Sequence, residues 1–153
     1  MKPGVSLLML LLYFTGTGFV QANSGLASPQ RPVHTYSIVA RDPATGQLGV
    51  AVQSHWFAVG SLVPWAQSGV GAVATQSFID VRYGVHGLQL MEQGKPAGEV
   101  LKHLLAADPN PAVRQVGMID ADGNIAQHTG DNCIQHAGCL LYTSDAADDL
   151  YTV

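Results

Sequence analysis

The chain has little charge and little cysteine. Only 12% of its 153 residues are Asp, Glu, Lys or Arg, and the formal net charge is −4. The seven Lys and Arg residues are scattered and do not alternate with aromatic residues, so we expect no nucleic-acid partner. Because 47% of the residues are apolar, the composition favours a compact fold over disorder. About 130 residues would suffice for one domain with a sizeable core.

The motifs of common metal and cofactor sites are also absent from the sequence. The six histidines lie far apart, without the i, i+4 pair that a metal-binding helix offers. The sequence contains no P-loop, dinucleotide fingerprint or Gly-x-Ser-x-Gly elbow. We therefore expect neither a metal nor a cofactor. Asp120 and Asp122 are either paired carboxylates or ordinary turn residues, and Cys133 is either a thiol nucleophile or a structural cysteine.

The N-terminus has the features of a secretory signal peptide. Lys2 precedes an apolar run at residues 5–14, and a small-x-small pattern ends at Ala22. The apolar run is far shorter than the roughly 20 residues of a membrane span, although an uncleaved anchor is the alternative. We predict cleavage after Ala22, or else after Ala27, and a secreted or periplasmic protein that meets the membrane only during export. Residues 23–34 are rich in Ser, Pro and Gly and predict a flexible lead-in.

The C-terminus differs in character from the rest of the chain. From Cys139 the sequence CLLYTSDAADD resembles the conceptual translation of a transposon-based sequencing adapter. This resemblance predicts that residues 139–153 are a non-native tail and that the native domain is truncated. Cys139 would then not be a native disulfide partner of Cys133. The alternative is a genuine acidic C-terminal helix.

The middle of the chain predicts an α+β domain. Apolar runs at 36–40 and 48–52 flank turn formers and predict a hairpin, and the continuous apolar run 70–75 predicts a strand buried on both faces. Residues 63–65 indicate an edge strand or a loop. Helical spacing predicts helices over 84–93 and 96–107, and a second hairpin follows over 115–128. This order of three strands, two helices and two strands favours two packed sheets with helices outside.

Thr35 is the residue that stands out chemically. It opens the first expected strand, at the boundary between the lead-in and the folded core. If processing made Thr35 the N-terminus, its α-amine, with a pKa of roughly 7.7–8.0, could take the proton of its hydroxyl. The alternative is a plain strand-opening threonine.

Several ordered blocks of the sequence match a known family, namely residues 35–42, 48–54, 58–60, 63–66, 69–76, 128–130 and Cys133. On these blocks, residues 35–138 resemble the bacterial domain-of-unknown-function 1028 (DUF1028) family. The resemblance covers nearly all of the expected native part but only the front portion of a family domain. It implies an N-terminal-nucleophile (Ntn) hydrolase-like fold of four αββα layers, whose relatives cut amide bonds with an N-terminal Thr, Ser or Cys. Some family members carry a peptidoglycan-binding region.

The resemblance implies Thr35 as the nucleophile. Ser54, His55 and Gln76 stand at expected strand ends, where site residues often gather, so we expect them to line a pocket near Thr35. The second expected strand ends in Ser54 and His55, where proteasome-like relatives carry an assisting Asp, and no Lys lies between Thr35 and Gln76. We expect backbone N–H groups around residues 69–71 to hold the oxyanion. The resulting hypothesis is an exported hydrolase acting on a small-molecule or peptide amide. The alternative is a non-catalytic exported binding domain at the cell wall, and no oligomeric state is predicted.

Overall fold

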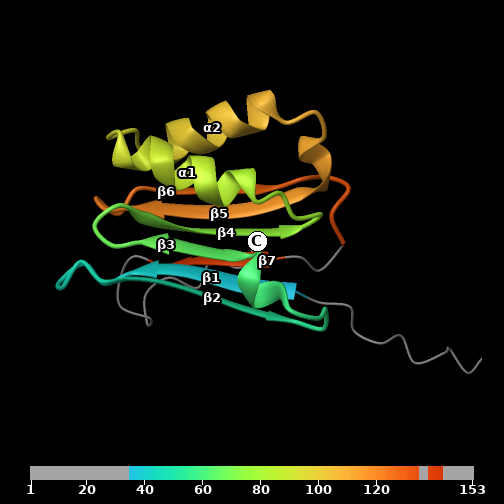
Figure 1. Ribbon diagram of the computed structural model, residues 1–153, viewed down its shortest axis with the longest axis horizontal. Coiled ribbons are helices and arrows are strands. Elements are labelled where there is room, and N and C mark those ends of the chain that lie inside the picture. The colour runs from blue at the N-terminus through green and yellow to red at the C-terminus, as the bar shows by residue number, and fades with distance from the viewer. Residues whose placement is uncertain (1–34, 135–137, 143–153) are drawn as a thin grey trace, which may run out of the picture. The chain divides into compact units, whose positions relative to one another are not determined.

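The computed structural model describes residues 35–134 and 138–142, which form two sheets and two helices. One sheet has three strands in the order β2-β1-β7, and the other has four in the order β3-β4-β5-β6. The two sheets face each other, and both helices lie on the far side of the four-stranded sheet (Figure 1). The elements are β1 (Thr35–Arg41), β2 (Leu48–Ser54), β3 (Pro64–Gln67), β4 (Gly71–Ser77), α1 (Arg82–Glu92), α2 (Ala97–Ala107), β5 (Arg114–Asp120), β6 (Ile125–Thr129) and β7 (Gly138–Tyr142), with 3-10 turns at Val59–Ser61 and Pro111–Val113.

The predicted first hairpin is confirmed as β1 and β2. The two strands are antiparallel, with Thr35 opposite Ser54 at the open end and Arg41 opposite Leu48 at the turn. Asp42 stabilises the turn by accepting hydrogen bonds from the Ala44 backbone N–H (2.8 Å) and the Thr45 hydroxyl (2.6 Å). This register places the start of β1 and the end of β2 side by side.

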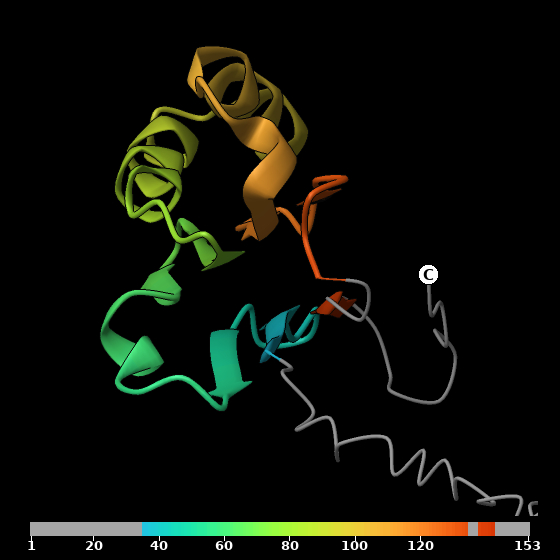
Figure 2. The same cartoon turned by 90° about the vertical axis from the view of Figure 1, so that its right-hand side faces the viewer.

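The continuous apolar run forms β4, which is buried on both faces as predicted. Alternation along β4 directs Ala72, Ala74 and Gln76 toward the three-stranded sheet, and Val73 toward the helices. One apolar core therefore lies between the sheets and a second lies under the helices. The end-on view shows helices, four-stranded sheet and three-stranded sheet as successive layers (Figure 2).

Both predicted helices are present, shifted by one or two residues at their ends. α1 contacts β3 and β4, and α2 contacts β5 and β6. The α1 face that meets the sheet includes Tyr83, Leu88 and Met91, and the α2 face includes Val100 and Leu101. The two described helices thus both cover the face of the stack formed by the four-stranded sheet.

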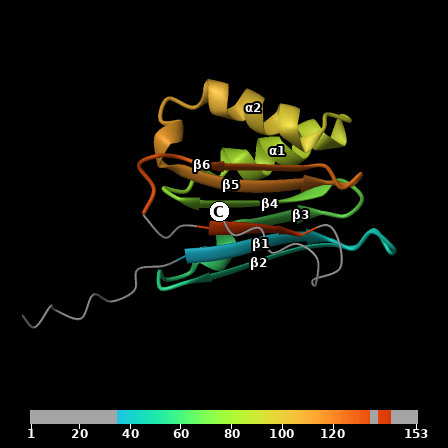
Figure 3. The same cartoon turned by 180° about the vertical axis from the view of Figure 1, so that it is seen from behind.

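The expected order of three strands, two helices and two strands left one segment open and lacked one strand. The segment at 63–65 becomes a true edge strand, β3, which pairs antiparallel with β4. A further strand, β7, pairs parallel with β1 (Figure 3). The described chain therefore has four strands before the helices and three after them.

β7 falls almost wholly inside the predicted non-native tail. β7 pairs with β1 through backbone groups, and its Cys139 and Leu141 side chains belong to the apolar core between the sheets. The origin of residues 139–153 stays a prediction. The predicted signal peptide and lead-in lie outside the described residues.

No helix among residues 35–134 is long or apolar enough to cross a membrane.

Candidate functional site

The candidate nucleophile lies at the open end of the β1–β2 hairpin. Thr35 is the first residue of β1, and its Oγ1 is 2.8 Å from the Oγ of Ser54, the last residue of β2. Either hydroxyl can be the donor of this hydrogen bond. The Ser54 Oγ also accepts the backbone N–H of Trp56 at 3.0 Å, which fixes the position of Ser54. The hairpin register thus brings two of the predicted site residues into direct contact.

Gln76 belongs to a row of polar side chains across the four-stranded sheet. It lies opposite Gln115 of β5, which lies opposite Thr129 of β6. Gln76 Nε2 donates to Gln115 Oε1 and, at 3.0 Å, to the carbonyl of Gly138 in the other sheet. Gln115 Nε2 donates to Thr129 Oγ1 at 3.2 Å. Because both glutamines are about 1% exposed, this row is a buried polar element between the sheets.

A pocket of about 540 Å³ lies at this end of the molecule. Three of the four predicted site residues line it, namely Thr35, His55 and Gln76, and Ser54 is hydrogen-bonded to the first of these. Strand ends from both sheets therefore converge on one cavity. The remaining lining residues are Trp56, Phe57, Val59, Leu62, Val63, Ser77, Phe78, Ile79, Gln115 and Ile134.

Three exposed aromatic side chains form the rim of this pocket. Trp56, Phe57 and Phe78 are 67%, 98% and 68% exposed, which is unusual for side chains of this size. The Trp56 ring also contacts the ring of His55, with 5.3 Å between the centroids and a tilt of 49°. The aromatic rim was not predicted from the sequence. The sequence feature that could have indicated it is the position of Trp56 and Phe57 directly after the end of a strand, because loops often carry binding residues.

Two non-glycine residues at the pocket have left-handed backbone. Ser77, which lines the pocket, has φ of 68°, and Ala58, between the lining residues Phe57 and Val59, has φ of 57°. Such conformations cost roughly 1–3 kcal/mol and cluster at functional sites. Their position adds support to this cavity as the candidate site.

The expected oxyanion donors at residues 69–71 were wrong. These residues precede and begin β4, whereas Gln76 lies near its other end. Five residues of strand separate Gly71 from Gln76, which is about 17 Å at 3.3 Å per residue. The backbone N–H of Val70 is already bonded to the Gln67 carbonyl. The glycine-rich segment is therefore a turn at the far end of the sheet.

A charged cluster lies behind the pocket rim. Asp108 accepts hydrogen bonds from Arg114 Nε (2.7 Å) and from the Tyr83 hydroxyl (2.9 Å). The Arg114 guanidinium is the main reason that the pKa of Asp108 falls to about 2. Burial and the bond to Asp108 raise the pKa of Tyr83. Arg114 Nη1 also donates to the carbonyl of Phe78 at 2.6 Å, so the cluster holds one side of the rim in place.

Asp120 and Cys133 have structural roles. Burial would raise the pKa of Asp120, but hydrogen bonds led by the Ala97 N–H (3.0 Å) outweigh it, so the pKa is lowered. Asp120 also accepts the backbone N–H groups of Asp122 and Asn124, which confirms the turn interpretation. Both cysteines are free, and the Cys133 thiol donates to the Arg114 carbonyl. Within residues 35–134 and 138–142, no three His, Cys, Asp or Glu side chains gather at a metal-binding spacing.

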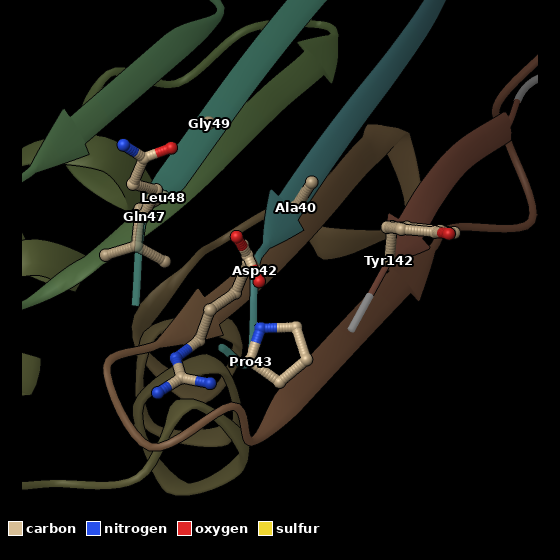
Figure 4. Close-up of a pocket in the computed structure, with 8 residues that line it drawn as sticks. Ala40, Asp42, Pro43, Gln47, Leu48, Gly49 and Tyr142 are labelled. Carbon is tan, nitrogen blue, oxygen red and sulfur yellow. The ribbon is translucent and has the colours of Figure 1, made fainter. Parts of the chain in front are cut away.

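A second hollow, of about 590 Å³, lies at the opposite end of the β1–β2 hairpin. Ala40, Asp42, Pro43, Leu48 and Tyr142 are among its lining residues (Figure 4). Hydrogen bonds led by that from Thr45 lower the pKa of Asp42, consistent with its role in the turn. None of the predicted site residues lines this hollow, so we place the candidate site at the Thr35 end.

Comparison with known proteins supports the family suggested by the sequence. The family model described as "Family of unknown function (DUF1028)" matches residues 35–147. The chain belongs to this family. A similar DUF1028 structure is the crystal structure of protein SPO2555 from Silicibacter pomeroyi, with 30% sequence identity and a TM-score of 0.64. The match covers 67% of this chain and 48% of SPO2555, so the chain spans about half the length of this relative. No curated protein matches the chain.

Proposed function

We propose that this DUF1028 protein is an exported amide-bond hydrolase with Thr35 as its nucleophile. The observation that carries the proposal is the position of Thr35, whose hydroxyl contacts Ser54 at the end of a pocket also lined by His55 and Gln76. The family match also begins at this residue. A nucleophile needs such a cavity because the scissile carbonyl must lie within reach of its oxygen.

The proposed mechanism requires a cut between His34 and Thr35. The freed α-amine accepts the proton of the Thr35 hydroxyl as Oγ1 attacks the carbonyl carbon of the amide. The amide C–N bond then breaks, the leaving amine takes that proton, and an ester to Thr35 remains. Water hydrolyses the ester, which releases the acid and restores the hydroxyl. The Ser54 hydroxyl lies 2.8 Å from Thr35 Oγ1 and, when it is the donor of this hydrogen bond, would stabilise the charge that develops there.

We also propose that the complete protein has the four-layer Ntn αββα arrangement. The described residues supply one helical layer and two sheets. A second helical layer, formed by residues that continue the native domain beyond this chain, would cover the outer face of β2-β1-β7. The length of SPO2555, of which the match covers 48%, is consistent with such an addition.

Export is part of the proposal, with residues 1–22 as the signal peptide and residues 23–34 as the lead-in. Secretion or a periplasmic location would place the hydrolase among extracellular amides. N-terminal sequencing of the mature protein tests both export and processing. We expect Thr35 at the terminus, whereas a terminus at Asn23 or Ser28 would rule out the Thr35 mechanism.

Catalysis is tested by substitution of the nucleophile. Thr35→Ala should abolish hydrolysis of amide and γ-glutamyl substrates, and Thr35→Ser, which keeps a hydroxyl, should retain part of it. Unchanged turnover by the Thr35→Ala variant would remove Thr35 as the nucleophile.

The second candidate function is a non-catalytic binding domain at the cell wall. The exposed faces of Trp56 and Phe57 favour it, since aromatic side chains offer flat apolar surfaces for sugars and peptides. Sedimentation with purified peptidoglycan tests this function. The binding function predicts that the Thr35→Ala variant still binds peptidoglycan and that a Trp56→Ala, Phe57→Ala double variant does not. This result would support the binding function, in particular if the wild-type protein hydrolyses no amide.

The tail proposal is tested separately. Resequencing of the intact genomic locus should show a sequence other than that of residues 139–153. Recovery of the same residues from genomic DNA would refute an adapter origin.

A further inference from the structure

The Gln76 side chain presents one unused acceptor at the pocket. Among the described residues, its Oε1 has no hydrogen-bond partner, although Gln76 is only 1% exposed. A buried acceptor without a partner costs roughly 1–3 kcal/mol and needs a physical explanation. Gln76 is one of the residues that line the pocket, so a donor held in the cavity would lie next to this side chain.

The orientation of this carboxamide is fixed by its neighbours. Nε2 donates both to Gln115 Oε1 and to the Gly138 carbonyl. Reversing the amide would bring Oε1 against the Gly138 carbonyl, which is itself an acceptor, so the observed orientation is favoured. The unused group is therefore an acceptor that requires an N–H or O–H donor.

The pocket beside this acceptor is lined mainly by apolar side chains. Among the described residues, thirteen line the pocket; eight of these are apolar, and none is Asp, Glu, Lys or Arg. Trp56, Phe57 and Phe78 expose aromatic surface there. An apolar group would gain contacts in this pocket, and among the described lining side chains only His55 could pair with a charged ligand that loses its hydration there.

We propose that the pocket binds neutral amides that carry an apolar or aromatic group. The amide N–H donates to Gln76 Oε1, and the apolar group packs against Trp56, Phe57 and Phe78. This inference builds on the proposed function because it specifies the substrate class of the same site. Binding of such amides does not depend on the nucleophile, so the ligand proposal and the hydrolase proposal can fail separately.

The first test uses two probes that differ by one methyl group. N-benzylacetamide has an amide N–H, and N-benzyl-N-methylacetamide lacks it. Binding to the full chain carrying Thr35→Ala, which is unable to hydrolyse the probes, is followed by chemical-shift changes in ¹H–¹⁵N spectra. We expect the N–H probe to bind about fivefold more tightly, the value of one good hydrogen bond. Equal affinities, or no binding of either probe, would overturn the proposal.

The second test assigns the acceptor and the rim. Gln76→Met keeps the side-chain length but removes the acceptor, so the preference for the N–H probe should disappear. Phe57→Ser should lower the affinity for both probes several-fold. Ile125→Ser is the matched control because Ile125 is also exposed (49%) but does not line the pocket, and it should change neither affinity. A preference that survives in the Gln76→Met variant, or equal effects of the two serine variants, would refute the assignment.

These results are separable from catalysis. If the probes bind as expected while the wild-type protein hydrolyses no amide, the ligand class stands and the hydrolase proposal fails. If amides are hydrolysed but the methyl group has no effect on affinity, the hydrolase proposal stands and the role of Gln76 fails.

Discussion

At the scale of single residues, Asp108 connects three elements. It follows the C-terminus of α2, accepts from Tyr83 of α1 and pairs with Arg114 of β5. Its Oδ1 also accepts the backbone N–H of Asn110 at 2.9 Å. With a side chain only 2% exposed, this carboxylate is poorly screened by solvent. Its charge is therefore a substantial contributor to the packing of the helices on the sheet.

We predict that Asp108→Asn lowers the free energy of unfolding by about 2 kcal/mol at pH 7, because a pKa of about 2 against the ordinary 3.8 corresponds to that energy. The lowered folded-state pKa means that the stabilisation is complete above pH ~4 and is lost as the pH falls through about 2. The difference in the free energy of unfolding between wild type and variant should be roughly half as large at pH 3 as at pH 7. Urea unfolding at several pH values measures it.

Asp122→Asn is the matched control for this prediction. Asp122 is exposed in the β5–β6 turn, so the free energy of unfolding of its variant should stay within about 0.5 kcal/mol of the wild-type value. If the loss in the free energy of unfolding caused by Asp108→Asn did not change between pH 3 and pH 7, the electrostatic explanation would be contradicted.

The candidate site could be predicted in part from residue positions. Thr35, Ser54, His55 and Gln76 were chosen because each stands at or beside an expected strand end, and the structure places all four at one end of the molecule. Gln115 was missed because its contact with Gln76 depends on the register between β4 and β5, which no local pattern specifies.

At the scale of elements, the packing of α1 on β3 depends on a glycine. Gly84 faces the Trp65 indole so closely that a Cβ there would overlap the ring. Trp65 is held in place by a 2.9 Å hydrogen bond from its Nε1 to the Leu62 carbonyl. The absence of a side chain at Gly84 thus allows the helix to approach the sheet.

We predict opposite effects of the same substitution in the two helices. Gly84→Ala should destabilise the protein by about 1–3 kcal/mol because the added methyl group forces Trp65 or the helix to move. Gly98→Ala, in α2, meets open space and should stabilise by about 0.5–1 kcal/mol through its helix propensity. Thermal unfolding of both variants measures the difference. Stabilisation by both would show that α1 can shift without cost.

The elements themselves were largely predictable, because the two hairpins and the two helices are specified by local periodicity and turn residues. β3 was left open because it is short and begins with a proline, which is compatible with an edge strand or a loop. β7 was missed because its parallel pairing joins segments about a hundred residues apart, and such a pairing leaves no local signal.

At the scale of the whole molecule, the described residues cover only one face of the three-stranded sheet. The helices contact the strands of the other sheet, and β2 pairs with β1 alone, so it is an edge strand in the described chain. The outward-facing residues of β2, which include Gly49 and Ala51, are exposed, and so is Tyr36 of β1 (48%). Exposed edges with small, uncharged side chains tend to pair with other chains.

We predict that the 153-residue chain self-associates through β2 and that Ala51→Lys suppresses this association. Ala51 is exposed in the middle of the edge strand, and a lysine there would place like charges against each other when two β2 strands pair. Sedimentation velocity over a range of protein concentrations should show several-fold less oligomer for this variant. His103→Lys is the control, since it introduces a lysine at an exposed position on α2, away from either sheet. If both variants reduce association equally, net charge is responsible and the edge is not. A wild-type chain that stays monomeric at every concentration tested would contradict the prediction outright, because association between edge strands increases with protein concentration.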